Sequence, residues 1–313
     1  MSTCRLTTPV LFIIFSRPDT TQKVFDAIRE AKPAKLFVAA DGPRENNDRD
    51  RQRCKETRDI IKQVDWDCEV KTLFHQKNLG CKLAPFTAIN WFFENVEEGI
   101  ILEDDCLPDP SFFLFCQELL YKYKNDETVM HIAGTNVLPC PNIKESFIFS
   151  RLVPTWGWAT WRRAWKLYDI EMKNWYKYKN SKDIKWFGRQ AKNFSSFIEN
   201  IMLEDIDAWD GQWAFTCLYY KGLGIIPKHN LIGNIGFRLD ATHTLTENER
   251  ITKVPVVGVE FPIILPNKKE PNSKFDEEYL QVHFGKVTVL KKVKKLIKNI
   301  INYFFNKKLR PYR

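Results

Sequence analysis

The chain has 313 residues, of which 44% are hydrophobic and 28% are charged, and its formal net charge is +9. This apolar content excludes global disorder, and 13 glycines and 16 prolines show no bias toward a fibrous or low-complexity chain. The length suits one large domain or two small ones, with enough material for a sizeable core.

The positive charge is concentrated at the C-terminus. Residues 286–313 contain ten Lys and Arg and no Asp or Glu, so residues 1–285 carry a net charge of 9 − 10 = −1. A general nucleic-acid-binding surface on the main body is therefore not expected, and we predict no nucleic-acid partner.

The basic tail at 286–313 has the pattern of an amphipathic helix. Its apolar residues lie on one helical stripe, with lysines on the other faces: Leu290, Val293, Ile297, Ile300, Ile301 and Phe304. This pattern is typical of a helix that lies on anionic lipid, and it predicts a peripheral location at the inner face of the membrane. A surface helix that caps the domain and an RNA-binding tail are the alternatives.

The start of the chain and the cysteines favour a cytoplasmic location. The apolar run at residues 10–15 is too short for a signal sequence or a membrane span. The eight cysteines form no Cys-x-x-Cys pair, which argues against a zinc ribbon or a redox motif. We expect reduced thiols.

The first 130 residues alternate short apolar runs with amphipathic stretches. Strands are predicted at residues 10–15, 35–40, 69–74 and 99–102, and helices at 20–31, 49–63, 83–95 and 111–123. Such alternation predicts an α/β, Rossmann-like, mostly parallel sheet flanked by helices. In these sheets ligands bind beyond the carboxyl ends of the strands.

The pattern changes after about residue 148. Tryptophans gather in a packing helix or a sugar-binding segment, where we expect Trp156 and Trp158 to lie near a sugar and Trp161 and Trp165 to lie in the core. Helices are predicted at about 194–205 and from 207 to 220, a short strand at 224–227, and irregular loops at 234–237 and 241–244. Residues 251–285 are expected to wrap the surface as an extension.

An acidic triplet follows the fourth predicted strand. Glu103, Asp104 and Asp105 would stand together at the carboxyl end of a buried strand. Carboxylate oxygens are hard ligands suited to Mg²⁺ or Mn²⁺, and such an ion can neutralise charge on a leaving diphosphate. A solvated acidic turn is the alternative.

The other predicted strand ends carry polar groups as well. Arg17 follows the first strand and could bind phosphate, Asp41 follows the second and could accept from a base or ribose, and Lys82 lies beyond the third. Taken singly, Asp41 could cap a turn, and Arg17 and Lys82 could be solvated surface side chains. Together they suit a nucleotide diphosphate.

These motifs resemble nucleotide-sugar glycosyltransferases of the GT-A fold, of the N-acetylglucosaminyltransferase I type and related bacterial enzymes. The resemblance covers about residues 8–245. It is carried by Phe-Ser-Arg-Pro-Asp-Thr at 15–20, Asp-Gly at 41–42, Glu-Asp-Asp at 103–105, Pro-Asp-Pro-Ser-Phe-Phe at 108–113 and Trp-Gly-Trp at 156–158.

The resemblance implies site roles and a domain division. Asp105 would bind the metal in a DxD-like motif, Glu103 and Asp104 would lie near the ribose and the sugar, Asp41 would hold the base, and Arg17 would meet the diphosphate. It implies a UDP-sugar donor, with UDP-GlcNAc as a candidate, and inversion at the anomeric carbon. A GT-A domain would span residues 1–250, with a nucleotide-binding half at about 8–130 and an acceptor half at about 131–250.

Two later residues complete the expected site. Asp210, in Trp-Asp-Gly-Gln-Trp, resembles the family's base in a Trp-Asp-Asp-Trp segment, but Gly211 replaces the second Asp and one residue is inserted. Asp207 is the alternative base, and helix capping is the alternative role for Asp210. His243 is a candidate metal ligand or a solvated loop histidine.

The sequence thus predicts an inverting, Mn²⁺- or Mg²⁺-dependent glycosyltransferase acting on a glycan or lipid-linked acceptor. A sugar-nucleotide nucleotidyltransferase is a rival, but it would need a glycine-rich basic loop after the first strand, where residues 16–19 read Ser-Arg-Pro-Asp. A non-catalytic, membrane-associated sugar-binding protein is the second rival.

Overall fold

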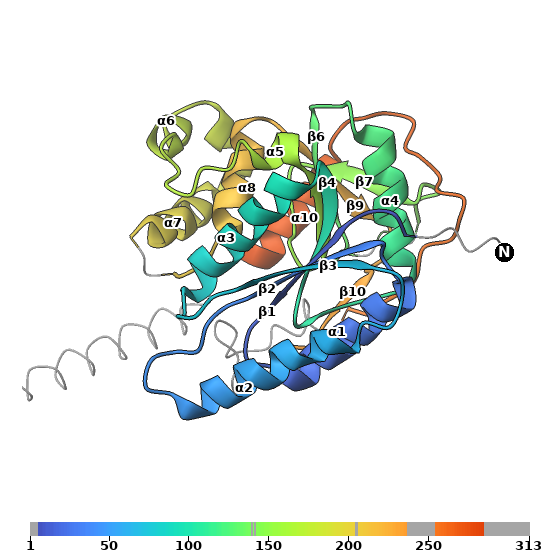
Figure 1. Ribbon diagram of the computed structural model, residues 1–313. Helices are drawn as coiled ribbons and strands as arrows, with labels where there is room; N and C mark the ends of the chain where they lie inside the picture. The colour runs from blue at the N-terminus through green and yellow to red at the C-terminus, as the bar shows by residue number, and fades with distance from the viewer. Residues whose placement is uncertain (1–5, 139, 141, 204–205, 237–253, 285–313) are drawn as a thin grey trace, which may run out of the picture.

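The computed structural model describes residues 6–138, 140, 142–203, 206–236 and 254–284 (Figure 1). The predicted metal ligand His243 and the predicted amphipathic tail at 286–313 lie outside the described residues. Both stay predictions, and so does the division of the chain into domains.

The described residues form one large sheet, one small sheet and helices around them. The large sheet contains β1 (Val10–Ile14), β2 (Lys35–Ala40), β3 (Glu69–Phe74), β4 (Glu98–Glu103), β6 (Val129–Ala133), β7 (Phe147–Ser150), β8 (Trp158–Trp161) and β9 (Leu223–Pro227), and the small sheet contains β5 (Cys106–Pro108) and β10 (Ile232–Asn234). The helices are α1 (Pro18–Ala31), α2 (Asp48–Asp59), α3 (Gly80–Asn95), α4 (Ser111–Tyr123), α5 (Arg162–Trp165), α6 (Trp175–Lys179), α7 (Ala191–Met202), α8 (Asp210–Tyr219) and α10 (Ser273–Phe284), with short 3₁₀ turns η1 (Ile60–Gln63) and η2 (Asp183–Gln190).

The large sheet has the order β3-β2-β1-β4-β8-β6-β9-β7. Strands β3, β2, β1 and β4 are parallel neighbours, β6 pairs in parallel with β9, and β8 and β7 are antiparallel to their neighbours. The predicted mostly parallel α/β sheet flanked by helices is therefore confirmed.

Alternate residues of β1 face opposite sides of the sheet, as the geometry of a strand requires. Val10, Phe12 and Ile14 pack in the core formed with α1 and α4. Leu11 and Ile13 pack in the core formed with α3, α5 and α8. Because both faces of the strand are covered, it is apolar along its whole length, which is why a plain apolar run identified it.

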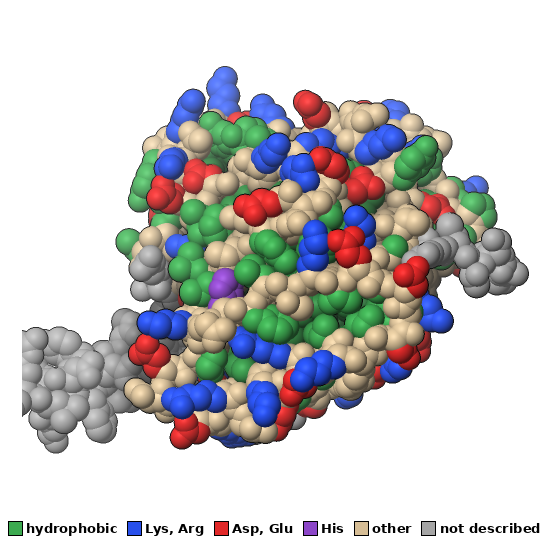
Figure 2. Space-filling model, viewed as in Figure 1, with side chains coloured by type: hydrophobic (Ala, Val, Ile, Leu, Met, Phe, Trp, Pro, Cys, Tyr) green, Lys and Arg blue, Asp and Glu red, His purple; other side chains and the backbone are tan. Residues whose placement is uncertain are grey.

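Helices α1 and α2 lie below the sheet in Figure 1, and α3 and α8 lie above it. On the surface viewed in the same orientation, Lys and Arg alternate with Asp and Glu along the lower edge, and apolar side chains gather across the middle (Figure 2). The connection from β1 leads to β2 on one side, whereas β4 lies on the other side of β1. The carboxyl ends of β1 and β4 therefore form the topological switch point, where open α/β sheets bind ligands.

The structure corrects several local predictions. The packing helix considered as one alternative for the tryptophan-rich segment is wrong, because Trp158–Trp161 is the antiparallel strand β8 and only the four residues of α5 are helical. The loop expected at 234–237 begins with Asn234, which ends β10. Helix α1 begins at Pro18, two residues earlier than predicted.

The extension after residue 253 is only partly a surface segment. Residues 254–272 lack regular elements and expose side chains such as Ile264 and Val257. Helix α10, which the sequence pattern did not reveal, buries Phe275 and Leu280 against the body. Within the described ranges, no helix is both long enough and apolar enough to cross a bilayer.

Candidate active site

The site is centred on an ion pair at the switch point. Arg17 follows β1 and precedes α1, and its Nη1 lies 2.6 Å from Oδ2 of Asp105 and 3.4 Å from Oδ1 of Asp104. Both carboxylates follow β4 directly. Arg17 and the acidic triplet therefore share the edge of the sheet at which the sequence predicted them.

The acidic triplet carries more negative charge than Arg17 can balance. Burial, with the charges of Asp105, Asp104 and Asp210, raises the pKa of Glu103 to about 8. Burial also raises the pKa of Asp104 to about 7, although Arg17 and the backbone N–H of Phe15, 3.0 Å away, oppose that shift. A bound cation would relieve this repulsion.

The residues at the end of β4 fit a hard divalent cation that is held partly by substrate. Within the ranges that the structure covers, no three His, Cys, Asp or Glu side chains form a preassembled metal centre. Mg²⁺, however, commonly binds through one or two carboxylates, water and substrate phosphates. Asp105, which is partly exposed, could supply the protein ligand in that arrangement.

Gly236 packs directly against the carboxylate of Asp105. The antiparallel pairing of β10 with β5 brings this segment beside the acidic turn, and Ile235 N donates to the carbonyl of Asp105 over 2.8 Å. A Cβ on Gly236 would clash with Oδ2, Cβ and Cγ of Asp105. Sequence reasoning missed this residue, because only the pairing of β10 with β5 reveals the contact.

Asp41 is a turn-organising residue. Its buried carboxylate accepts hydrogen bonds from the backbone N–H groups of Gly42, Leu79 and Gly80 and from Nδ2 of Asn78, at 2.8 to 3.1 Å. These four donors occupy the four lone pairs of the carboxylate. The structure thus shows the turn-capping role of Asp41, and the expectation that this side chain also binds the base stays a prediction.

Asp207 caps helix α3, whose first N–H groups, those of Leu79 and Gly80, are bound by Asp41. Its Oδ2 accepts from Cys81 N over 2.8 Å and its Oδ1 accepts from Lys82 N over 3.0 Å, in the first turn of α3. Gly80, with φ +82°, lies so close that a Cβ there would be 2.7 Å from Asp207 Oδ2. Asp207 is therefore occupied as a cap, and Lys82 lies half-buried on that turn.

Asp210 is exposed at the first position of α8 and accepts from Gly211 N over 2.9 Å. Its charge contributes to the raised pKa values of Glu103, Tyr168 and Tyr279. The hydroxyl of Tyr168 donates to the carbonyl of Trp209 over 3.0 Å and anchors the start of the helix. The N-cap of α8 is Trp209, so the helix-capping alternative for Asp210 is wrong, and its role as a base stays a prediction.

The tryptophans divide differently from the prediction. Trp158 is fully buried, and stacks on His131 and Trp209 with ring centroids 5.1 and 5.5 Å away, so it cannot stack on a sugar and that prediction is wrong. Trp161 and Trp165 lie in the core as expected. Trp156 is only half-buried and remains a candidate for sugar contact.

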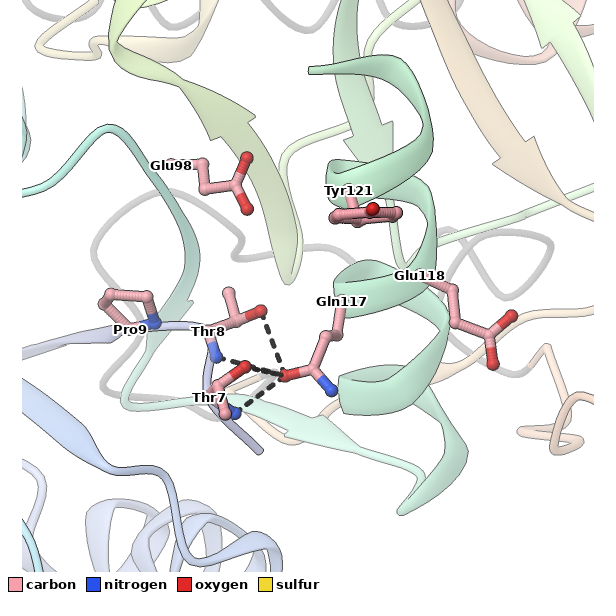
Figure 3. Close-up of a pocket in the computed structure, with 7 residues that line it drawn as sticks. All are labelled: Thr7, Thr8, Pro9, Glu98, Gln117, Glu118 and Tyr121. Atoms are coloured by element: carbon pink, nitrogen blue, oxygen red, sulfur yellow. Dashed lines mark hydrogen bonds between the residues drawn. The ribbon is translucent and has the colours of Figure 1, made fainter. Parts of the chain in front are cut away.

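Cavities at the surface of the described residues include two with different positions relative to the site. One, of about 600 Å³, lies beside the first turn of α3 and Asp207. The other, of about 340 Å³, lies where Thr7 and Thr8 donate to Oε1 of Gln117 (Figure 3). Because it adjoins Pro9 and Glu98, at the amino ends of β1 and β4, it is remote from the carboxyl-end site.

No protein-family model matches the sequence, and no curated protein is significantly similar to it. Similar solved structures include 4-diphosphocytidyl-2C-methyl-D-erythritol synthase from Anaerococcus prevotii, with TM-score 0.34, 10% identity and coverage of 88% of this chain and 99% of that one. A UDP-glucose pyrophosphorylase complexed with UDP-glucose has TM-score 0.32, 11% identity and coverage of 51% and 78%. An inositol-1-phosphate CTP transferase from T. maritima has TM-score 0.31, 12% identity and coverage of 51% and 74%.

These three are nucleotidyltransferases, the rival class named from the sequence, and no glycosyltransferase is among them. At TM-scores this low the similarity carries no argument between the two activities. The class of the fold is defined by the sheet itself, which is Rossmann-like with an acidic turn at its switch point.

Proposed function

We propose that the protein is a metal-dependent, inverting glycosyltransferase that moves a sugar from a UDP-sugar, with UDP-GlcNAc as the first candidate, to a glycan or lipid-linked acceptor. The observation that carries the proposal is the pairing of Arg17 with Asp105 at the switch point. It sets a phosphate-binding cation and a metal-binding carboxylate side by side, where a sugar diphosphate needs both.

The donor would bind along the ends of β1 and β4. Arg17 would turn from Asp105 to the diphosphate, and Glu103 and Asp104 would lie near the ribose and the sugar. Asp105 would hold Mn²⁺ or Mg²⁺, which when bound would neutralise charge on the departing UDP. Lys82 would add a cation at the rim.

Asp210 would act as the base. It would accept the proton of the acceptor hydroxyl as that oxygen attacks the anomeric carbon, while the bond from this carbon to the diphosphate breaks and its electrons leave with UDP. One displacement inverts the configuration. The occupation of Asp207 by the N–H groups of Cys81 and Lys82 supports this choice.

Nucleotidyl transfer is the alternative, and the link after β1 argues against it. Only three residues, Phe15, Ser16 and Arg17, separate β1 from α1, and none is glycine. This leaves little backbone to wrap a triphosphate.

Binding and product analysis test the proposal. UDP and UDP-GlcNAc should raise the melting temperature in the presence of Mn²⁺, because a ligand that binds only the folded state stabilises it. UDP-sugar incubated with Mn²⁺ should release UDP and free sugar. Release of pyrophosphate from a nucleoside triphosphate and a sugar phosphate would establish the alternative instead, and no response to any UDP compound would contradict the proposal.

Peripheral attachment to the membrane through residues 286–313 belongs to the same proposal. The full chain should sediment with vesicles that contain anionic lipid and not with neutral vesicles or RNA. Equal binding to neutral vesicles would contradict it.

A further inference from the structure

The cavity of about 600 Å³ beside Asp207 has the size of a small-molecule pocket. It is bounded by the first turn of α3, the end of α7, residues 170–172 and residues 206–207. Seven of its ten lining residues are apolar: Ile206, which belongs to the last of these segments, and Leu79, Leu83, Ile170, Met172, Ile201 and Met202.

The charged residues of this pocket are mostly engaged elsewhere. Asp207 accepts from two N–H groups of α3, and Glu171 lies 3.0 Å from the ammonium of Lys173. Lys82 has no ion pair among the residues that the structure describes. The pocket thus offers mainly apolar surface, which suits a hydrocarbon group and not a sugar ring that needs many hydrogen bonds.

The pocket adjoins the candidate base. Its wall residue Ile201 packs on Gly211, where a Cβ would clash with Cδ1 of Ile201. Gly211 follows Asp210 directly, so the absence of a side chain at 211 lets the wall of the pocket reach the residue beside the base. This gives a physical reason for glycine at the position where the resembling family has aspartate.

The pocket also adjoins the donor side of the site. Cys81 lies between Gly80 and Lys82 in the first turn of α3, and the charges of Asp207, Glu103 and Asp41 all act on its thiol. The first turn of α3 thus lines the pocket through Lys82 and binds Asp207, and it is close enough to the end of β4 for the charge of Glu103 to act on it. A molecule in the pocket could present a hydroxyl to Asp210 opposite a donor sugar.

We infer that this pocket binds the apolar aglycone of the acceptor, so that the enzyme prefers a sugar or alcohol carrying a hydrocarbon chain to a free glycan. The inference rests on the proposed function for the role of Asp210. It narrows the acceptor to an amphipathic molecule, whose chain enters between α3 and α7.

Binding of a simple alkyl glycoside tests the pocket without any donor. The full chain is titrated with octyl β-D-glucoside, kept below its micelle concentration, and with methyl β-D-glucoside, by calorimetry. We expect binding of the octyl compound only. Leu83→Gln and Met202→Gln should each weaken it about tenfold, as expected for loss of apolar contact in a pocket.

Leu265→Gln is the matched control, because Leu265 is 38% exposed, close to 44% for Leu83, but lies in the extension remote from the pocket. It should bind the octyl compound like the unmodified chain. Circular dichroism and melting temperature verify the fold of each variant.

The outcomes separate this inference from the proposed function. Equal affinity for the octyl and methyl compounds, or unchanged octyl affinity in both pocket variants, overturns the inference even if UDP binds with Mn²⁺. Octyl binding in a chain that binds no UDP compound overturns the donor assignment and with it the acceptor role of the pocket. Transfer from UDP-sugar to the octyl compound, reduced in Leu83→Gln and unchanged in Leu265→Gln, supports both.

Discussion

Asp41 and Asp207 bind the same helix terminus from two distant parts of the chain. Asp41 accepts from the N–H groups of Leu79 and Gly80, and Asp207 accepts from those of Cys81 and Lys82. Together they satisfy the four N–H groups at the start of α3, which have no partner within the helix. The first turn of α3, which lines the apolar pocket, is thereby fixed by two carboxylates.

Loss of the buried cap should destabilise the protein more than loss of the exposed one. Asp41→Ala removes four hydrogen bonds in a buried site, and we expect a decrease of about 3 kcal/mol or more in the free energy of unfolding, measured with urea. Asp207→Ala should cost about 1 kcal/mol, the usual effect of an exposed helix cap. Equal effects would contradict the assigned burial.

Asp210→Asn and Asp207→Asn form a matched pair for the base. Only Asp210 is proposed to take a proton, so transfer should fall about 100- to 10,000-fold in Asp210→Asn and by less than about tenfold in Asp207→Asn. Initial rates with saturating UDP-sugar and Mn²⁺ measure both. The reverse ranking would move the base to Asp207.

Asp105→Asn should abolish metal-dependent turnover and leave the fold intact. The substitution removes a full negative charge from the proposed ligand, while Arg17 keeps Asp104 as a partner at 3.4 Å. UDP release is followed as Mn²⁺ is titrated, with the melting temperature as the check on folding. Full activity in this variant would refute the metal assignment.

Gly236→Ala should impair the same step by displacing the carboxylate of Asp105. The new methyl group would occupy the space of Oδ2 and Cγ. We expect a higher Mn²⁺ requirement and about tenfold or more lower turnover, in the range that small misplacements of catalytic groups produce. Gly233→Ala in β10, three residues earlier, is the control, since its Cβ would meet Val256 at an ordinary 3.5 Å. Identical kinetics of the two variants would show that Asp105 tolerates the shift.

His131 should make the protein less stable in acid. It is fully buried in β6, accepts from Trp213 Nε1 over 3.1 Å and donates to the carbonyl of Pro154 over 2.8 Å, and burial lowers its pKa to about 3. Between about pH 6.5 and pH 3 the unfolded chain binds a proton at this residue that the folded chain does not. Stability is therefore lost as the pH falls through this interval, by up to about 1.4 kcal/mol per pH unit.

The contribution of His131 is isolated by comparison with His131→Gln, which cannot titrate. Urea unfolding at pH 7.5 and pH 4.5 should show a larger decrease for the unmodified chain, although the variant is less stable at the higher pH. Parallel pH dependence of the two chains would place the acid-sensitive group elsewhere.

The strands and helices of the first half were predictable because each is a local pattern. A strand covered on both faces is apolar throughout, as β1 and β2 are, and parallel order brings the ends of such strands to one edge. That was enough to place Arg17 beside Asp104 and Asp105. The predictions failed where the neighbours of a side chain come from distant parts of the sequence. Trp158 was expected to contact a sugar, but His131 and Trp209 cover it.

The sequence by itself determined which chemistry is present: carboxylates and an arginine at the ends of buried strands, and an aspartate at the start of a late helix. Only the tertiary structure decided which of these side chains are engaged by the backbone and which lie at the switch point. Asp41 and Asp207 accept from the N–H groups at the start of α3, whereas the carboxylate of Asp105 contacts Arg17, Gly236 and the thiol of Cys106 at the switch point. The physical reason is that hydrogen-bond partners and packing contacts are set by distance in space, which local sequence patterns do not encode.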